Sequence, residues 1–272
     1  MISAFLNNDT RAIHLNFRSI VRYAMAPTTC AEVQARLGTL KMPPRMTESW
    51  PNLTDAATDF RFLLARGYPR KNALGLVGNR YGLDEIGRRL LHRGVFAPEP
   101  AGARRAKLRR LRDLPGLPLA LDGHNVLITL ECAGRGLPLV AADDGFIRDE
   151  GEISGAFKVS PATDRVLALV ADYLADHTAG PLNVFYDAPL SLSGELARRT
   201  QEIFASRGLA VQAAAVPVPE RLLSGFAGAI ATSDTALIDA HATVVDLAGE
   251  IIRRHPAWRL TYLREPGPGV EG

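Results

Sequence analysis

Between residues 54 and 94, apolar positions recur at the spacing of an α-helix. Three short amphipathic segments follow one another there, separated by Gly- and Pro-containing breaks at residues 67–69 and 82–84. Thr54 and Asp84 stand where helix N-caps are expected, and Gly94 follows the last segment. The pattern predicts a three-helix domain over residues 54–97, whose second and third helices have helix-turn-helix proportions.

From residue 117 onward, short apolar runs alternate with segments of helical spacing. The runs that predict strands are residues 117–121, 137–141, 182–186, 209–216, 228–231 and 243–245. The segments that predict helices are residues 125–133, 164–177, 194–207, 219–223, 235–240 and 247–254. Strands that alternate with helices are typical of a largely parallel, Rossmann-like sheet flanked by helices. The predicted fold class is therefore α/β, with a small N-terminal helical unit ahead of the sheet.

The remaining segments complete the predicted domain organisation. Residues 1–50 form a poorly defined N-terminal extension, and Met42 and Met46 leave open a later start of translation. Residues 98–112 are interpreted as a basic linker, and residues 113–260 as the α/β domain. Residues 261–272 are rich in proline and glycine, which predicts a flexible tail.

Charge divides the chain in a way that the net value of +3 conceals. Residues 66–112 carry 13 basic and 3 acidic side chains, whereas residues 113–272 carry 12 basic and 21 acidic ones. A basic segment attracts polyanions, and an acidic one holds divalent cations, although solvated helix faces explain both equally well. Residues 104–112 form either a short surface helix or an arm that faces nucleic acid. The basic residues expected to bind a nucleic-acid backbone are Arg70, Lys71, Arg80, Arg104, Arg105, Arg109 and Arg110.

Several functional classes are excluded by what the sequence lacks. Its apolar runs are shorter than the roughly 20 residues of a membrane-spanning helix, so we expect no membrane association. Two cysteines, Cys30 and Cys132, are too few for a disulfide framework or a four-ligand zinc site, which favours a cytoplasmic protein. The phosphate-binding loop, the dinucleotide-binding glycine motif, the nucleophile elbow and the zinc-protease motif are all absent from the sequence.

Aspartates follow most of the predicted strands. Asp122, Asp187 and Asp234 each come at or just after a strand end, as do Asp143, Asp144 and Asp246. The carboxyl ends of parallel strands share one edge of a sheet, so these carboxylates are expected to meet and to hold Mg²⁺ or Mn²⁺. The alternative is that each caps the following helix, a role that fits Asp144 and Asp246 well. Asn125, one turn beyond Asp122, either orients a ligand or binds phosphate, or it caps its own helix.

A second set of candidates concerns phosphate. Residues 191–196, S-L-S-G-E-L, begin a predicted helix whose free backbone amides suit an anion, with Ser191 and Ser193 as contacts. An ordinary capping segment explains the same residues equally well.

Longer strings resemble a known group. L-D-G-H-N-V-L-I resembles the opening strand and helix of PIN-like and NYN-type nuclease domains, and A-T-S-D-T-A-L resembles their late metal-binding element. L-L-A-R-G-Y-P-R-K-N-A-L-G-L-V-G-N-R-Y-G-L, D-D-G-F-I-R-D and F-Y-D-A-P-L-S-L-S-G-E-L-A resemble the prokaryotic family called domain of unknown function 434, with a C-terminal PIN-like partner domain. The resemblance covers roughly residues 54–250.

The resemblance implies a site. It assigns metal ligation to Asp122, Asp187 and Asp234, with Asp143 or Asp144, preferably Asp144, as the fourth ligand. Glu195 is the nearest match to a helical glutamate, and Thr232 and Ser233 are expected phosphate contacts. It implies a metal-dependent endoribonuclease that acts on RNA rather than DNA, and it leaves a homodimer open. A catalytically inactive nucleic-acid-binding protein is one alternative, and a metal-dependent phosphatase or nucleotide-processing hydrolase is another.

Overall fold

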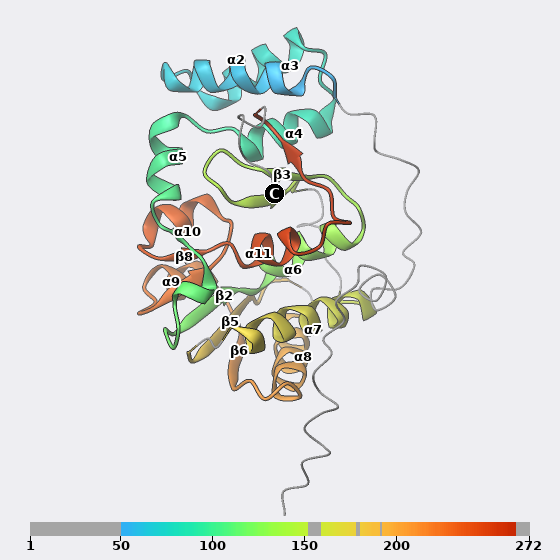
Figure 1. Ribbon diagram of the computed structural model, residues 1–272, viewed down its shortest axis with the longest axis vertical. Coiled ribbons are helices and arrows are strands. Elements are labelled where there is room, and N and C mark those ends of the chain that lie inside the picture. The colour runs from blue at the N-terminus through green and yellow to red at the C-terminus, as the bar shows by residue number, and fades with distance from the viewer. Residues whose placement is uncertain (1–49, 152–158, 178–179, 191, 265–272) are drawn as a thin grey trace, which may run out of the picture.

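The computed structural model describes residues 50–151, 159–177, 180–190 and 192–264 (Figure 1). Most of the expected N-terminal extension, most of the expected C-terminal tail, Cys30 and Ser191 lie outside these residues. Among the described helices, none combines the length and the apolar character that crossing a membrane would require.

Three helices begin the described chain: α2 (Leu53–Ala65), α3 (Arg70–Arg80) and α4 (Glu85–Gly94). They pack around Phe60, Leu90 and Leu91, all of which are fully buried. Asp84 caps α4 by accepting the backbone N–H of Gly87 at 2.7 Å, as the sequence predicts. No strand occurs within residues 53–97, so this part of the chain is helical (Figure 1).

The central sheet has six strands, and every pairing within it is parallel. Its order is β1-β8-β7-β2-β5-β6, where β1 is Leu108–Arg109, β2 Leu119–Asp122, β5 Leu182–Asp187, β6 Val211–Val216, β7 Ala229–Ala231 and β8 Val244–Val245. The α/β class and the largely parallel sheet predicted from the sequence are thereby confirmed.

Helices cover both faces of this sheet because the side chains of each strand alternate between two cores. Leu119 and Leu121 of β2 face one core, whereas Ala120 between them faces the other. The first core is closed by α6 (Gly123–Gly134), α7 (Pro161–Asp176), α8 (Ser193–Ala205) and α11 (Leu247–Arg253). The second is closed by α9 (Pro219–Ser224) and α10 (Thr235–Ala240).

One predicted strand of the main sheet lies elsewhere. Residues 137–141 contribute β3 (Leu139–Ala141), which pairs antiparallel with β4 (Ile147–Asp149) and parallel with β9 (Thr261–Tyr262) in a separate sheet. The turn at Asp143–Asp144–Gly145 reverses the chain immediately, with Gly145 at φ +93°, so no crossover helix follows β3. Val140 of β3 and Leu263, which directly follows β9, belong to the same core as α2–α4.

The segment interpreted as a linker is ordered structure instead. Residues 98–112 contain α5 (Pro98–Arg105) and the edge strand β1, followed by a short 3₁₀ turn at Leu111–Asp113. Its path is fixed by tertiary contacts: the Arg104 guanidinium donates two hydrogen bonds of 2.7 Å to the Asp239 carboxylate. Residues 98–112 are basic and contain few apolar residues, so their sequence does not predict contacts with residues as distant in the chain as Asp239.

Gly123 offers a test of the packing beneath the sheet edge. A Cβ atom at this position would overlap the ring of Tyr186, which is fully buried and whose hydroxyl hydrogen-bonds Thr200 at 2.7 Å. We expect Gly123→Ala to lower the free energy of unfolding by about 1–3 kcal/mol in urea denaturation. Gly102→Ala in α5 is the matched control, because nothing lies within 4 Å of its added Cβ, and no loss is expected there. Equal stability of the two variants would contradict the packing described.

Candidate functional site

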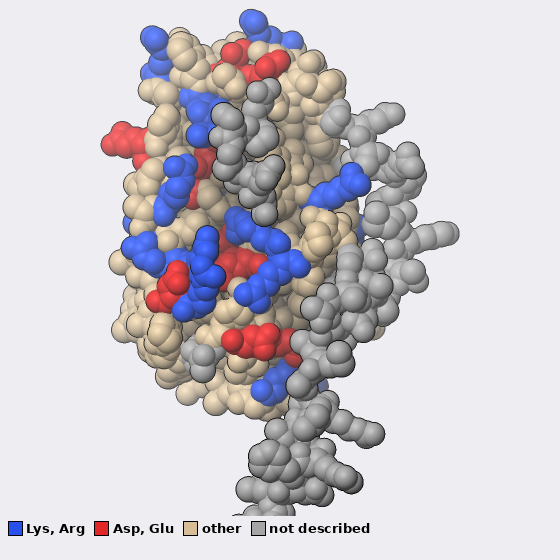
Figure 2. Space-filling view, in the orientation of Figure 1, with Lys and Arg blue, Asp and Glu red and all other residues tan. Residues whose placement is uncertain are grey.

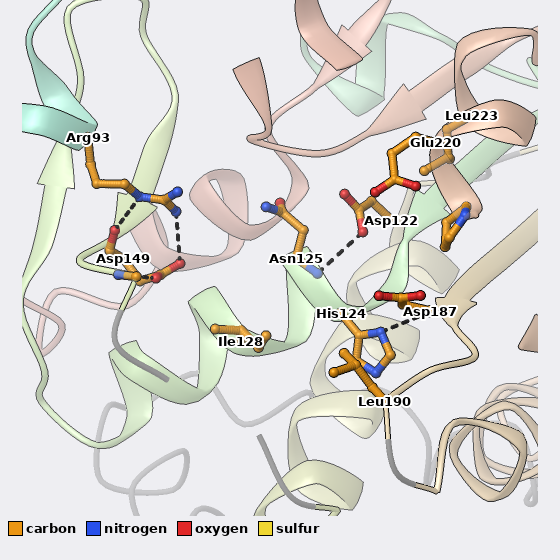
Figure 3. A pocket seen from close by; sticks show the side chains of 12 residues that line it. Arg93, Asp122, His124, Asn125, Ile128, Asp149, Asp187, Leu190, Glu220 and Leu223 are labelled. Carbon is orange, nitrogen blue, oxygen red and sulfur yellow. Dashed lines mark hydrogen bonds and ion pairs between the residues drawn. The ribbon is translucent and has the colours of Figure 1, made fainter. Parts of the chain in front are cut away.

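A cavity of about 210 Å³ opens at the carboxyl ends of β2 and β5 (Figure 3). Four carboxylates line it: Asp122, Asp149, Asp187 and Glu220. The polar lining is completed by Arg93, His124 and Asn125. A ligand site outside the carboxyl ends of the strands is the expected place in a parallel α/β sheet.

Asp122 lies at the centre of this edge, at the end of β2 and at the N-cap of α6. Its Oδ2 accepts the Thr232 hydroxyl at 2.9 Å, and its Oδ1 accepts the backbone N–H of Asn125 in a longer contact of 3.4 Å. Burial raises the pKa of Asp122 to about 6, against the opposing effect of these hydrogen bonds, and the negative charges of Asp234 and Glu220 raise it further.

The segment Thr232–Ser233–Asp234 is fixed around Asp122. The Asn125 Oδ1 accepts both the backbone N–H of Ser233, at 2.8 Å, and its hydroxyl, at 3.1 Å. Asp234 caps α10 through hydrogen bonds from the N–H groups of Ala236 and Leu237. Asp234 therefore takes the capping role, and it does not line the cavity, although its charge acts on Asp122.

Asp187 and His124 form the next part of the site. Asp187 ends β5, and its backbone N–H donates to the His124 Nδ1 at 3.1 Å. Burial lowers the pKa of His124, so the imidazole is neutral near pH 7, and an Nδ1 that accepts a hydrogen bond places the proton on Nε2. The Ser193 hydroxyl contacts the carbonyl oxygen of Asp187 at 2.7 Å and so fixes the end of the strand.

Three charged lining residues were not anticipated from the sequence. Glu220 follows β6 at the start of α9, and Figure 3 shows its carboxylate beside that of Asp122. The string V-P-V-P-E places a carboxylate just beyond a predicted strand, which is the signal that identified the aspartates. Arg93 and Asp149 had no such signal, since α4 and β4 reach the cavity only through tertiary packing.

Three carboxylates of the cavity, the partly buried Asp122 and Asp187 and the exposed Glu220, differ from the buried carboxylates of the protein. Asp143 pairs with Arg61 at 2.8 Å, Asp144 with Arg148 at 2.8 Å, and Asp246 with Arg253 at 3.2 Å. Among the described residues, no lysine or arginine forms an ion pair with Asp122, Asp187 or Glu220. Within the described part of the chain, the buried carboxylates are thus neutralised, whereas these three at the sheet edge have no lysine or arginine partner.

Asp144 is therefore not part of the carboxylate group expected from the sequence. It is fully buried and receives two hydrogen bonds from Arg148, whose Nε donates to the Ser233 carbonyl oxygen at 2.8 Å. The antiparallel β3–β4 turn explains the error, because it removes Asp143 and Asp144 from the edge of the main sheet. Glu195 is likewise elsewhere: it pairs with Arg198 and Arg199 on α8 and does not line the cavity.

The serine and threonine candidates for phosphate contact are engaged inside the protein. Ser193, Thr232 and Ser233 are buried, and their hydroxyls bond Asp187, Asp122 and Asn125 respectively. They position the site rather than offer donors to a ligand. Ser191 lies outside the described residues.

The basic segment is partly neutralised by the protein's own acidic residues. Arg89 pairs with Glu150, Arg93 with Asp149 and Arg104 with Asp239, each joining the N-terminal segment to the rest of the chain. Two of the expected nucleic-acid contacts are internal: Arg104 is buried, and Arg70 donates to the carbonyl oxygens of His92 and Val95. The exposed members of the expected set are Lys71, Arg80, Arg105, Arg109 and Arg110. Basic and acidic side chains lie side by side on the face shown in Figure 2.

The side chains that line the cavity suit some kinds of metal site better than others. Within the described part of the chain, no three His, Cys, Asp or Glu side chains stand close enough together to hold an ion. A closed zinc site is therefore not preformed there. Mg²⁺ is commonly held by one or two carboxylates, with water and substrate phosphate completing its shell. Asp122 and Glu220, side by side in Figure 3, supply such a pair.

Comparisons with known proteins find relatives of unknown activity. A model described as Protein of unknown function (DUF434) matches residues 52–107, and one described as Domain of unknown function (DUF5616) matches residues 111–250. Uncharacterized protein MJ0935 of Methanocaldococcus jannaschii is 30% identical over 203 residues, which cover 74% of this chain and 97% of that protein. No solved structure gives a significant match. The resemblance to the 434 family is thereby confirmed for the helical segment, and the chain belongs to the DUF5616 family.

Proposed function

We propose that this protein is a Mg²⁺- or Mn²⁺-dependent phosphodiesterase that cleaves RNA, with a PIN-like arrangement of carboxylates at the sheet edge. The observation that carries the proposal is the group Asp122, Asp187 and Glu220, which lines one cavity without an ion pair to any described lysine or arginine. Carboxylates held together without a counter-charge destabilise the folded protein. A bound divalent cation would remove that cost, which would explain why these carboxylates lie together.

The residues of the cavity have distinct roles in this proposal. Asp122 and Glu220 hold the cation. Asp187 adds negative charge and contacts the cation through a water molecule. A cation bound there would polarise a phosphodiester and lower the pKa of a nearby water. The Asn125 Oδ1 is fixed by Ser233, so its amide N–H₂ is the part of this side chain that remains to donate to a phosphate oxygen.

Cleavage assays with chosen variants test the proposal. Single-stranded RNA and DNA are incubated with Mn²⁺, and wild type is compared with Glu220→Gln. We expect RNA cleavage that chelation abolishes and that Glu220→Gln reduces by roughly tenfold or more. Asp164→Asn is the matched control, because Asp164 pairs with Arg199 on the surface and does not line the cavity.

Other outcomes would favour the two alternatives. RNA binding without any cleavage would indicate an inactive nucleic-acid-binding protein. Hydrolysis confined to phosphate monoesters or nucleotides would indicate a phosphatase or a nucleotide-processing enzyme. Either result would refute the phosphodiesterase.

The exposed arginines of residues 109 and 110 give a separate prediction about RNA binding. Arg109→Ala combined with Arg110→Ala should reduce the slope of log affinity against log salt by about 0.7–0.9 for each phosphate that these side chains neutralise in the wild-type complex. The measurement is a fluorescence titration with single-stranded RNA at several salt concentrations. Arg198→Ala is the control, because this exposed arginine pairs with Glu195 and Glu202 on α8. A slope that stays at the wild-type value would exclude these arginines from the RNA interface.

A further inference from the structure

Arg93 brings positive charge into an otherwise acidic cavity. It lies in the last turn of α4, in the helical N-terminal unit, whereas Asp122, Asp187 and Glu220 come from the edge of the main sheet. Among the described residues that line the cavity, it is the only lysine or arginine. Figure 3 shows Arg93 and Asp149 on one side and Asp122 with Glu220 on the other.

The contacts of Arg93 leave most of its donors uncommitted. Its Nε donates to the backbone carbonyl oxygen of Asp149 at 2.9 Å, and its Nη2 lies 3.5 Å from the Asp149 Oδ2. These contacts use two of the five N–H donors of a guanidinium, so three have no partner among the described residues. The side chain is 31% exposed, which gives a ligand access to those donors.

Asp149 has hydrogen-bond donors other than Arg93. Its Oδ1 accepts the backbone N–H of Gly151 at 2.7 Å, and its Oδ2 accepts the Thr129 hydroxyl at 3.1 Å. The 3.5 Å contact with Arg93 is long for a charge-assisted hydrogen bond, which is typically about 2.7–2.9 Å. The backbone contact therefore orients the guanidinium, while its charge is only weakly satisfied.

We propose that Arg93 binds a phosphate group of the substrate adjacent to the phosphodiester that is cleaved. A planar guanidinium matches two phosphate oxygens, and an anion in this cavity is attracted by Arg93 while Asp122 and Glu220 repel it. The inference rests on the proposed function for the identity of the substrate. It also gives the two family segments a joint role: the DUF434 segment supplies the phosphate contact, and the DUF5616 segment supplies the carboxylates.

Binding without metal separates this inference from the hydrolase proposal. Adenosine 3′,5′-bisphosphate is titrated into the full chain in EDTA by calorimetry. Arg93→Gln should weaken binding by roughly tenfold to hundredfold, since a charged hydrogen-bonding group is removed. Arg93→Lys should retain part of the affinity, because lysine keeps the positive charge but lacks the paired N–H donors that match two phosphate oxygens. Asp122→Asn and Glu220→Gln should bind as tightly as wild type or more tightly, because each removes a repelling charge.

Arg89→Gln is the matched control, since Arg89 lies one turn earlier on α4, pairs with Glu85 and Glu150, and does not line the cavity. It should bind the bisphosphate as wild type does. Undetectable binding by wild type, or equal affinities of wild type and Arg93→Gln, would overturn the inference. So would RNA cleavage by Arg93→Gln with an unchanged KM, a result that would leave the hydrolase intact. Binding that depends on Arg93 in a protein that cleaves nothing would support the phosphate site and refute the hydrolase.

Discussion

Asp122→Asn should reduce metal-dependent RNA cleavage by roughly a hundredfold or more, while the metal-free protein stays as stable as wild type, or becomes more stable, at pH 7. Folding raises the pKa of Asp122 from 3.8 to about 6, so the folded protein binds this proton more tightly than the unfolded chain. The associated stability is complete below pH 3.8 and is lost as the pH rises through 6. At pH 7 the ionised carboxylate therefore costs at most about 3 kcal/mol, and asparagine removes that cost.

Metal-free melting at pH 5 and pH 7.5 measures this effect. Wild type should lose stability between the two values relative to Asp122→Asn, whose side chain does not titrate. Asp84→Ala is the control for loss of a cap, because Asp84 accepts the Gly87 N–H at 2.7 Å and lies outside the cavity. Loss of such a cap costs about 1 kcal/mol. If Asp122→Ala loses as much stability as Asp84→Ala and cleaves RNA normally, Asp122 is a helix cap and the metal site is refuted.

Arg148→Met should lower the free energy of unfolding by about 3–5 kcal/mol, the largest stability effect that we expect. Arg148 and Asp144 are both buried, and they are joined by two hydrogen bonds of 2.8 and 2.9 Å. Without Arg148, the one ion pair that Asp144 retains among the described residues is with the Arg104 Nη1, at 3.6 Å. The Ser233 carbonyl oxygen also loses its donor beside the cavity.

Urea denaturation of the single and double variants separates the ion pair from general packing. Combining Arg148→Met with Asp144→Leu should restore much of the lost stability, because well-packed apolar residues often replace a buried pair at little cost. Arg198→Met is the surface control and should change stability by no more than about 1 kcal/mol, since its pairing with Glu195 is solvent-exposed. A double variant as unstable as Arg148→Met alone would show that the buried charge is not the cause.

The class of fold and the strands that carry Asp122 and Asp187 can be predicted from the sequence. Local physics is sufficient for that: apolar runs of strand length alternate with helical spacing, and Asp or Gly marks many of their ends. The same pattern predicted that strand ends carry carboxylates, and β2 and β5 bring Asp122 and Asp187 to one cavity. Capping is equally local: Asp84 was expected as a helix cap and caps α4. Of the two aspartates that fitted the capping alternative, Asp246 caps α11 and Asp144 caps no described helix.

Which carboxylates share the cavity depends on tertiary contacts. Asp144 and Asp122 look alike in the sequence, each following an apolar run, but β3 turns back into β4 while β2 continues into a helix. Arg148 then neutralises Asp144, and Asp122 faces Glu220 instead. Arg93 reaches the cavity because α4 packs against the small sheet through a shared core. Burial and ion pairing depend on residues far apart in the chain, so no local pattern encodes them.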